Sequence, residues 1–404
     1  MYKKKILFVI HGLNAGGAEK SLVSLLNSLP LENYDIDLMA IDPTGIFRDQ
    51  IPHSVNLVDA PVELVCQSVR ILSRRFWRHA NVKMIMLKFA SIIGWHLYCR
   101  KTKLQKSHDQ YYNEIWKRYI PGYSKSYDIA ISYIDYTNYY VIDHIKAKKK
   151  ILWCHNDYNK LEYIPDYDYS YYKNAYKICT ISELCKQALI SNFPKLIDKF
   201  EVVENISSAR IISVQATMMD EIQTANDGFL EDNRFKLVSV GRLSEQKGFD
   251  YAIDAAKIMK DKGVEFCWYV LGEGALRKKL EEQIRKNNVN DCIKFIGIRS
   301  NPYPYIRLAD IYVMPSRYEG KSIALDEAKI LCKPIVVTNY PSVFDAIEDG
   351  KNGLIVKMDA LSIAETIMRL HNDTLLQRNF INNLESENCS NEKQVVAKFL
   401  KIIN

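Results

Sequence analysis

Residues 311–328, with the sequence IYVMPSRYEGKSIALDEA, decide the fold of this 404-residue chain. The first four residues form a short apolar run of the kind found in buried parallel strands, and Pro315 ends that run. An apolar pattern with helical spacing begins near residues 320–323. We therefore expect Glu319 in the loop between a strand and a helix, and Glu327 about two turns further along.

The same alternation of strand and helix extends in both directions from this segment. Helical patterns lie between most of the apolar runs, so we predict an α/β fold with doubly wound parallel sheets. Two such Rossmann-like domains would face each other across a cleft lined by the carboxyl ends of the strands. The predicted strands are 6–10, 36–41, 129–134, 151–155 and 178–181, then 237–240, 267–271, 293–296, 311–314, 335–337 and 354–356.

A polar, mixed stretch after residue 212 divides the chain, and the pair Asp227 and Gly228 within it predicts a turn. We place the N-terminal domain at 1–212, a linker at 213–234 and the C-terminal domain at 235–385. A final helix within 386–404 is expected to pack back on the N-terminal domain.

The composition is that of a soluble globular protein, with 48% hydrophobic and 25% charged residues. The nine cysteines are scattered without a C-x-x-C pair, which favours a reducing cytosol. The apolar run near the N-terminus is too short for a signal peptide. The longest uncharged apolar run, 89–99, is about half of what a spanning helix needs. We therefore expect a cytoplasmic protein that is not integral to a membrane.

The residues around the two glutamates suit a phosphorylated sugar. The start of a helix offers free backbone amides and a positive dipole end, and Glu327 can accept hydrogen bonds from a ribose diol. Arg242 and Lys247 follow another strand and can clamp a diphosphate. The plain alternatives are a loop carboxylate, a solvent-facing helix glutamate and a solvated basic loop.

Motifs in the correct order along the chain favour the functional interpretation. The C-terminal half contains VGRLSEQKG at 240–248, LGEG at 271–274 and PIVVTN at 334–339 beside the paired glutamates. With these, it closely resembles the second domain of family 4 retaining glycosyltransferases of the bacterial surface-polysaccharide type, which have the GT-B fold. The N-terminal half resembles the same family at GLNAGGAE (12–19), WCHND (153–157) and EVVEN (201–205).

The resemblance implies transfer of a hexose or N-acetylhexosamine from a nucleotide sugar, commonly a UDP sugar, to a lipid-linked or polysaccharide acceptor in cell-surface glycan biosynthesis. The N-terminal domain would bind the acceptor. The implied catalytic residues are Glu319, His155, Arg242 and Lys247. The implied donor-binding residues are Gly16, Gly17, Arg242, Lys247, Ile298, Arg299, Gly320, Lys321, Ser322 and Glu327.

The family uses its two cations in place of a metal, so we expect no metal and no cofactor. The Asp-x-Asp triplet at 166–168 lies in a tyrosine-rich stretch that we expect at the surface. Lys321 and Ser322 depart from the family pattern, in which an aromatic or apolar residue precedes Gly or Pro. This departure leaves the identity of the donor sugar open.

Two other functions fit parts of the sequence. A GT-B sugar-nucleotide epimerase would share the architecture, but the histidine and acidic pattern expected of it is absent. A nucleic-acid-binding protein would explain a basic segment, but not the paired glutamates or the glycine loops. We expect no nucleic-acid partner.

The net charge of +7 is concentrated in residues 66–106, which contain ten Lys or Arg and no Asp or Glu. Arg70, Arg74 and Arg78 recur at four-residue spacing near Trp77, which predicts a helix at an anionic membrane surface. Residues 84–95 form a second, more apolar helix, for which a place in the core is an equal alternative. The segment would bring the enzyme to the inner face of the plasma membrane as a peripheral protein.

Overall fold

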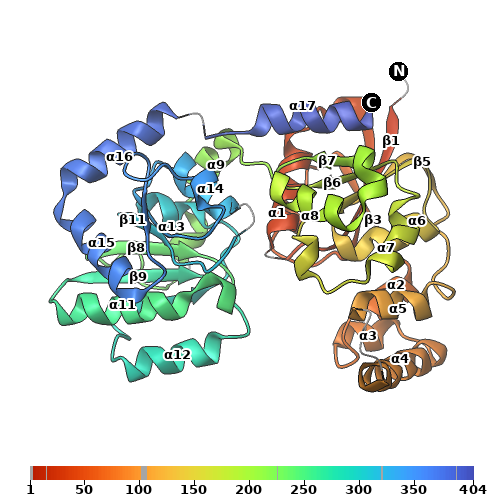
Figure 1. Ribbon diagram of the computed structural model, residues 1–404, viewed down its shortest axis with the longest axis horizontal. Coiled ribbons are helices and arrows are strands. Elements are labelled where there is room, and N and C mark those ends of the chain that lie inside the picture. Colours follow the sequence, from red (N-terminus) through yellow and green to blue (C-terminus); the bar gives the residue numbers. More distant parts are fainter. Residues whose placement is uncertain (1–2, 15, 102–106, 225, 320–321, 388) are drawn as a thin grey trace. The chain divides into compact units, whose positions relative to one another are not determined.

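The computed structural model describes residues 3–404 except 15, 102–106, 225, 320–321 and 388. The chain folds into two compact units. Unit 1 comprises Met1–Asn205 together with Gln394–Asn404, and unit 2 comprises Ile206–Lys393. Each unit contains one parallel sheet (Figure 1).

The seven strands of the unit 1 sheet have the order β3-β2-β1-β4-β5-β6-β7. Residues 6–10 of the central strand β1 are fully buried, as expected of a parallel strand covered on both faces. The strands are β1 (Lys4–Gly12), β2 (Tyr34–Asp42), β3 (Val55–Val58), β4 (Ser126–Ser132), β5 (Lys146–Cys154), β6 (Lys177–Thr180) and β7 (Phe200–Val202).

Helices cover both faces of this sheet. On one face Leu7 and Val9 share a core with residues of α2, α5, α6, α7 and α8. On the other face Phe8 stacks on Phe399 of α17, with ring centroids 6.1 Å apart. The helices are α1 (Gly17–Ser28), α2 (Val62–Ser68), α3 (Arg74–His79), α4 (Val82–Lys101), α5 (His108–Trp116), α6 (Asn138–His144), α7 (Pro165–Tyr172), α8 (Glu183–Asn192) and the final helix α17 (Glu392–Ile403).

The six strands of the unit 2 sheet have the order β10-β9-β8-β11-β12-β13, with a separate core on each face. The strands are β8 (Phe235–Val240), β9 (Phe266–Leu271), β10 (Ile293–Gly297), β11 (Ile311–Met314), β12 (Ile335–Thr338) and β13 (Leu354–Val356). The helices are α9 (Ala209–Gln215), α10 (Asp220–Thr224), α11 (Phe249–Asp261), α12 (Arg277–Lys286), α13 (Tyr303–Leu308), α14 (Ile323–Ile330), α15 (Ala360–Asn372) and α16 (Thr374–Ser386). The predicted doubly wound parallel sheets are confirmed.

The division between the units differs from the predicted boundaries. Unit 2 begins at Ile206, not after a linker at 213–234. Ile212, Ala216 and Phe229 from that stretch are buried in the unit 2 core. The stretch was predicted to be a linker because most of its residues are polar, although its few apolar residues pack α9 and α10 against the core. At the other end, the last residues of the chain belong to unit 1.

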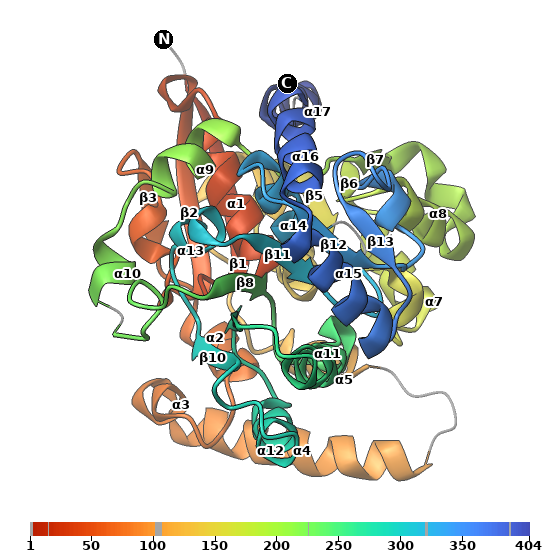
Figure 2. The ribbon, with the colours of Figure 1, turned by 90° about the vertical axis from the view of Figure 1, so that its left-hand side faces the viewer.

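The basic segment also differs from expectation. The first stretch forms only the six-residue helix α3, with Phe76 fully buried and Arg75 paired with Asp42. The second stretch lies in α4, shown in orange in Figure 2. Of the helices in the described residues, α4 is the one that is long and apolar enough to cross a membrane, by length and composition alone.

The expected surface position of the 166–168 triplet is wrong for Asp168, whereas Asp166 is exposed. Asp168 is fully buried in unit 1, where its carboxylate accepts hydrogen bonds from Gln110 Nε2 (2.9 Å), Tyr139 Oη (2.7 Å) and Tyr158 Oη (2.8 Å). Three neutral donors offset the cost of burying this carboxylate. Tyr158 lies ten positions before Asp168, and Tyr139 comes from α6.

Candidate active site

The turns at the carboxyl edge of the unit 2 sheet pack closely because two glycines permit it. Gly248 has φ +62°, and a Cβ there would lie 2.0 Å from the carbonyl oxygen of Pro315. A Cβ on Gly272 would lie 1.9 Å from the carbonyl oxygen of Gly241. The turns after β8, β9 and β11 are therefore held together at the edge where α/β sheets bind ligands.

Glu319 and Lys247, predicted to act on the donor, are in direct contact. Lys247 Nζ lies 2.6 Å from Glu319 Oε1, and Ser316 Oγ donates to the same oxygen at 2.7 Å. Only 8% of the Glu319 side chain and 18% of the Lys247 side chain are exposed. The structure thus joins the loop after β11 to the loop after β8 through a largely buried ion pair.

A second ion pair fixes these two loops to each other. Arg317 donates from both terminal nitrogens to Asp250, at 2.8 and 2.6 Å, and lies 4.3 Å from the centroid of the Tyr251 ring. The backbone of Arg317 also donates to the carbonyl oxygen of Gln246 at 2.7 Å. A bidentate arginine pair of this kind fixes orientation as well as distance, so Glu319 and Lys247 stand on a rigid support.

Arg242 differs from Lys247. Its side chain is exposed and forms no hydrogen bond or ion pair with any residue that the structure describes. An arginine that has no partner among the described residues, beside a largely buried lysine, leaves its five N–H donors available to an anion. The structure therefore places one engaged cation and one available cation on the same turn.

Glu327 is buried on α14, with 1% of the residue exposed. Tyr303 Oη of α13 donates to its Oε1 at 3.1 Å. The alternative of a solvent-facing helix glutamate is therefore wrong. Ser322 precedes the first residue of α14, within the predicted range for the start of the helix. Gly320 and Lys321 lie outside the described residues.

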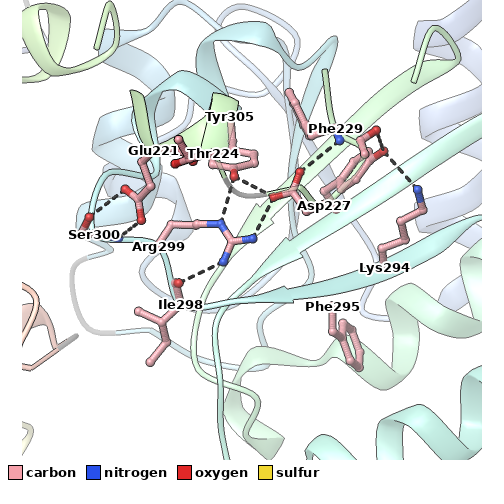
Figure 3. Close-up of polar contacts among 12 residues, drawn as sticks. Glu221, Thr224, Asp227, Phe229, Lys294, Phe295, Ile298, Arg299, Ser300 and Tyr305 are labelled. Carbon is pink, nitrogen blue, oxygen red and sulfur yellow. Dashed lines mark hydrogen bonds and ion pairs between the residues drawn. The ribbon is translucent and has the colours of Figure 1, made fainter. Parts of the chain in front are cut away.

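Ile298 and Arg299 follow β10 (Figure 3). Gly297, the last residue of that strand, has φ +79°. Ile298 is 44% exposed, whereas the Arg299 side chain is turned into the protein. Arg299 Nη2 donates to Asp227 Oδ2 at 2.8 Å, and its Nε donates to Tyr305 Oη at 2.9 Å. The guanidinium is thus occupied, and the loop offers a ligand its backbone and the Ile298 side chain.

Sequence reasoning missed the two carboxylates that hold this loop. Asp227 also accepts from Tyr305 Oη at 2.7 Å, and the neighbouring guanidinium and hydroxyl keep the pKa of Asp227 below its usual value despite burial. Glu221 accepts from the backbone N–H of Ser300 at 2.9 Å and from that of Asn301 at 2.8 Å. Asp227 was predicted only as a turn residue, because its partners lie about seventy positions away.

The candidate residues of unit 1 lie after β1 and β5. Gly16 precedes the first residue of α1, and Gly17 is that first residue. His155 follows β5, and its ring lies against Trp153 (centroids 6.0 Å apart) and Tyr133 (5.1 Å). Burial lowers the pKa of His155 to about 3, so the imidazole is neutral. Its Nε2 has no hydrogen-bond partner among the described residues.

An acidic residue beside His155 was not predicted either. Asp135 follows β4, and Asn156 Nδ2 donates to its Oδ2 at 3.2 Å. Burial raises the pKa of Asp135 to about 6. Its Oδ1 has no hydrogen-bond partner in the described part of the chain. Across the described residues, no group of three His, Cys, Asp or Glu is arranged to hold a metal ion.

Comparison with known proteins relates the second half of the chain to a family of enzymes. Residues 221–387 match the family described as glycosyl transferases group 1. The amylovoran biosynthesis glycosyltransferase AmsK of Erwinia amylovora is 32% identical over 144 residues, which cover 33% of this chain and 35% of AmsK. The putative colanic acid biosynthesis glycosyltransferase WcaL of Salmonella typhimurium is 32% identical over 152 residues, or 35% of this chain and 37% of WcaL. The chain thus spans little more than a third of the length of these relatives.

Solved structures resemble the whole chain at low sequence identity. HepE of Anabaena in complex with UDP-glucose has a TM-score of 0.66 at 16% identity, covering 99% of this chain and 98% of HepE. S. aureus TarM, solved with fondaparinux, alpha-GlcNAc-glycerol and UDP, has a TM-score of 0.64 at 16% identity, covering 99% and 100%. Residues 221–387 are thus similar to the glycosyl transferases group 1 family, and the chain as a whole has the GT-B fold of these solved structures.

Proposed function

We propose that the protein is a retaining, metal-independent glycosyltransferase that moves a hexose or N-acetylhexosamine from a UDP sugar to a glycan or lipid-linked acceptor. The observation that carries this proposal is the buried contact of Lys247 with Glu319, placed shortly before the start of α14. If the pair of Lys247 and Glu319 served only the stability of the fold, no second cation would be needed beside it. Arg242 nevertheless lies exposed on the same turn, where it can bind an anion.

The proposed chemistry is mainly positioning and electrostatics. Arg242 and Lys247 would bind the diphosphate and stabilise the negative charge that develops as it leaves. Glu319, held by Ser316 at 2.7 Å, would orient the transferring sugar through its hydroxyls. The acceptor hydroxyl would attack on the face from which the nucleotide departs, and the departing phosphate would take its proton. Two preorganised cations make a bound metal unnecessary in this scheme.

The nucleoside would be held by two further groups. The buried carboxylate of Glu327, already fixed by Tyr303, would accept hydrogen bonds from the ribose diol. The exposed Ile298 side chain and the backbone beside it would hold the base, while the Arg299 side chain braces the loop from behind. The solved structures of HepE and TarM contain UDP, which supports UDP as the carrier.

Unit 1 would supply His155 and the acceptor site. A neutral imidazole can either donate or accept a hydrogen bond, which suits a sugar hydroxyl better than a charged ring would. Gly16 and Gly17, at the amino end of α1, would permit close approach of the backbone to the donor phosphates or the acceptor. We place the protein in the cytoplasm, at the inner face of the membrane where a lipid-linked acceptor is presented.

The test is a panel of nucleotide sugars, with and without candidate acceptors, in excess EDTA. We expect one UDP sugar to be hydrolysed slowly without acceptor, and the glycoside product to keep the anomeric configuration of the donor by NMR. An inverted product, or turnover that stops with EDTA and returns with Mg²⁺ or Mn²⁺, contradicts the proposal. Release of an epimerised sugar without any transfer would instead identify an epimerase.

A matched variant pair shows whether the site is the one described. Glu319→Gln breaks the buried pair with Lys247, whose atoms are 2.6 Å apart, and Glu348→Gln breaks an exposed pair with Lys351, whose atoms are 2.7 Å apart. We expect only Glu319→Gln to abolish most of the turnover. Equal activity in the two variants would place the reaction elsewhere.

A further inference from the structure

Helix α4 has one face that packs inside unit 1. On this face Lys88 Nζ donates to the carbonyl oxygen of Gln67 in α2 at 2.7 Å, and Ser91 Oγ accepts from Trp116 Nε1 in α5 at 3.0 Å. Lys88 and Ser91 are buried, and burial lowers the pKa of Lys88 to about 8. These contacts fix the rotation of the helix about its own axis.

The opposite face of α4 is apolar and exposed. Val82, Met86, Phe89, Ile93 and Leu97 follow one another at spacings of three or four residues, so they form one stripe along the helix. Their exposed fractions lie between 49% and 72%. An apolar stripe that is not covered by the rest of the fold marks a surface that binds something apolar.

Two residues next to α4 extend this surface. Leu72 is 92% exposed and Trp77, in α3, is 54% exposed. With the five residues of the stripe they are seven of the 21 large exposed apolar side chains in the described residues, within a 26-residue segment. We call these seven residues the α3–α4 surface. Figure 2 shows α3 and α4 together at the lower edge of unit 1.

The charged residues of the segment that carries the α3–α4 surface all have one sign. Arg70, Arg74, Arg78, Lys83 and Arg100 are exposed, and residues 66–106 contain no acidic residue. Two of the cations counted in the sequence do not contribute, because Arg75 is paired with Asp42 and Lys88 is buried. An apolar stripe in a segment whose charged residues are all cations is complementary to a surface that is both apolar and anionic, which is what a bilayer of acidic lipids presents.

We propose that the α3–α4 surface binds an anionic bilayer, with α4 lying in the plane of the lipid headgroups. This inference rests on the proposed location at the inner face of the membrane, but it does not depend on the sugar-transfer reaction. The sequence analysis predicted that the basic helix around Arg74 binds the membrane, and it gave a place in the protein core as an equal alternative for residues 84–95. The apolar contact comes from α4, and the exposed arginines of α3 supply the charge.

Although α4 is long enough to span a membrane, the contacts on its inner face favour an orientation parallel to the membrane surface. A transmembrane α4 would separate Lys88 from Gln67 and Ser91 from Trp116, and would leave an ammonium group in hydrocarbon. In the plane of the bilayer, the inner face keeps those contacts and only the exposed stripe enters the lipid. Peripheral binding therefore conserves the fold that the structure shows.

The experiment is co-sedimentation of the full-length protein with vesicles, without donor or acceptor. Vesicles of phosphatidylcholine alone are compared with vesicles that also contain phosphatidylglycerol, at low and high salt. We expect binding to the anionic vesicles only, weakened by salt, and lowered by about fivefold for each exposed cation that is removed. Met86→Glu together with Ile93→Glu should lower the partition coefficient at least tenfold.

The matched control introduces two glutamates elsewhere. Leu361→Glu with Leu375→Glu replaces two leucines of similar exposure, 51% and 67%, on α15 and α16 of unit 2. This variant should bind vesicles almost as the wild type does, and circular dichroism should show both variants to be folded. Equal partitioning of the two variants, or wild-type binding that is the same on neutral and anionic vesicles, overturns the proposal.

One further outcome names a different partner. If the wild-type protein is a dimer by analytical ultracentrifugation without lipid, and Met86→Glu with Ile93→Glu makes it a monomer, a second copy of the chain covers the stripe. That result also overturns the proposal. Failure here would leave sugar transfer by the soluble protein intact, so the two proposals are tested separately.

Discussion

Replacing Asp227 by asparagine removes the charge that holds the loop after β10. The carboxylate accepts from Arg299 Nη2, Tyr305 Oη and the backbone N–H of Phe229, at 2.8, 2.7 and 3.0 Å. Only 8% of its side chain is exposed. Asparagine keeps the shape and one acceptor oxygen, so the change isolates the charge that faces Arg299.

The expected magnitude follows from that geometry. A hydrogen bond to a charged group contributes about 1.5–3 kcal/mol to stability, and asparagine retains part of it, so we expect a loss of about 2 kcal/mol. For a domain of this size such a loss lowers the melting temperature by roughly 4–8 °C. If the whole loss of about 2 kcal/mol acts on the conformation of the base-binding loop, the affinity for UDP falls by up to about 30-fold.

The assay is titration calorimetry with UDP, and Asp232 provides the control. Asp232 forms the same kind of contact, with Arg234 at 2.7 Å and Tyr269 Oη at 3.0 Å, and its side chain is also 8% exposed. Lys294 of β10 lies 3.9 Å from the Asp232 carboxylate, but none of these three partners belongs to the loop after β10. Asp232→Asn should therefore cost similar stability but leave UDP affinity unchanged. If both variants lose affinity equally, or neither does, Asp227 does not position the loop.

Three further predictions concern the candidate catalytic residues. Substituting Arg242 or Lys247 by alanine should cost roughly 2–4 kcal/mol of transition-state stabilisation, measured as kcat/KM with EDTA present, and a loss below tenfold would argue against the diphosphate clamp. Glu327→Gln should weaken UDP binding while Glu319→Gln should mainly lower kcat, and calorimetry that gives the reverse order refutes these roles. Because burial lowers the pKa of His155 from 6.5 to about 3, the unfolded state binds the proton that the folded state excludes, and stability falls as the pH falls from about 6.5 to 3. His155→Gln should remove that part of the slope in denaturant titrations, and an unchanged slope would show that the ring is not buried in solution.

The strands were predictable because they carry local signals. Residues 6–10 and 311–314 are short apolar runs ended by glycine or proline, and both are central strands. Glu319 and Glu327 were found because a strand, a loop and a helix follow one another within 18 residues. The paired-glutamate motif can thus be recognised from the local sequence, without any knowledge of contacts between distant residues.

What the sequence could not reveal depends on contacts between distant residues. Asp227 and Asp168 are short acidic side chains in polar stretches, and nothing nearby distinguishes them from surface residues. Arg299, which donates to Asp227, lies 72 positions away in the sequence, and Gln110, which donates to Asp168, lies 58 positions away. The start of unit 2 at Ile206 escaped notice for the same reason, since α9 is recognisable as core only through what it packs against. Long-range pairing, not local propensity, decides each of these cases.

The assignment of the last eleven residues to unit 1 has a consequence for the synthesis of the protein. Phe399 of α17 lies against Phe8 and Trp153, and Lys4 donates to the carbonyl oxygen of Ile403. A growing chain leaves the ribosome from its N-terminus, so β1 emerges well before α17, which follows the whole of unit 2 in the sequence. Unit 2 is continuous in sequence and can finish folding earlier. The apolar residues that α17 covers therefore lack this helix while unit 2 is synthesised, and apolar surface of this kind is what chaperones bind.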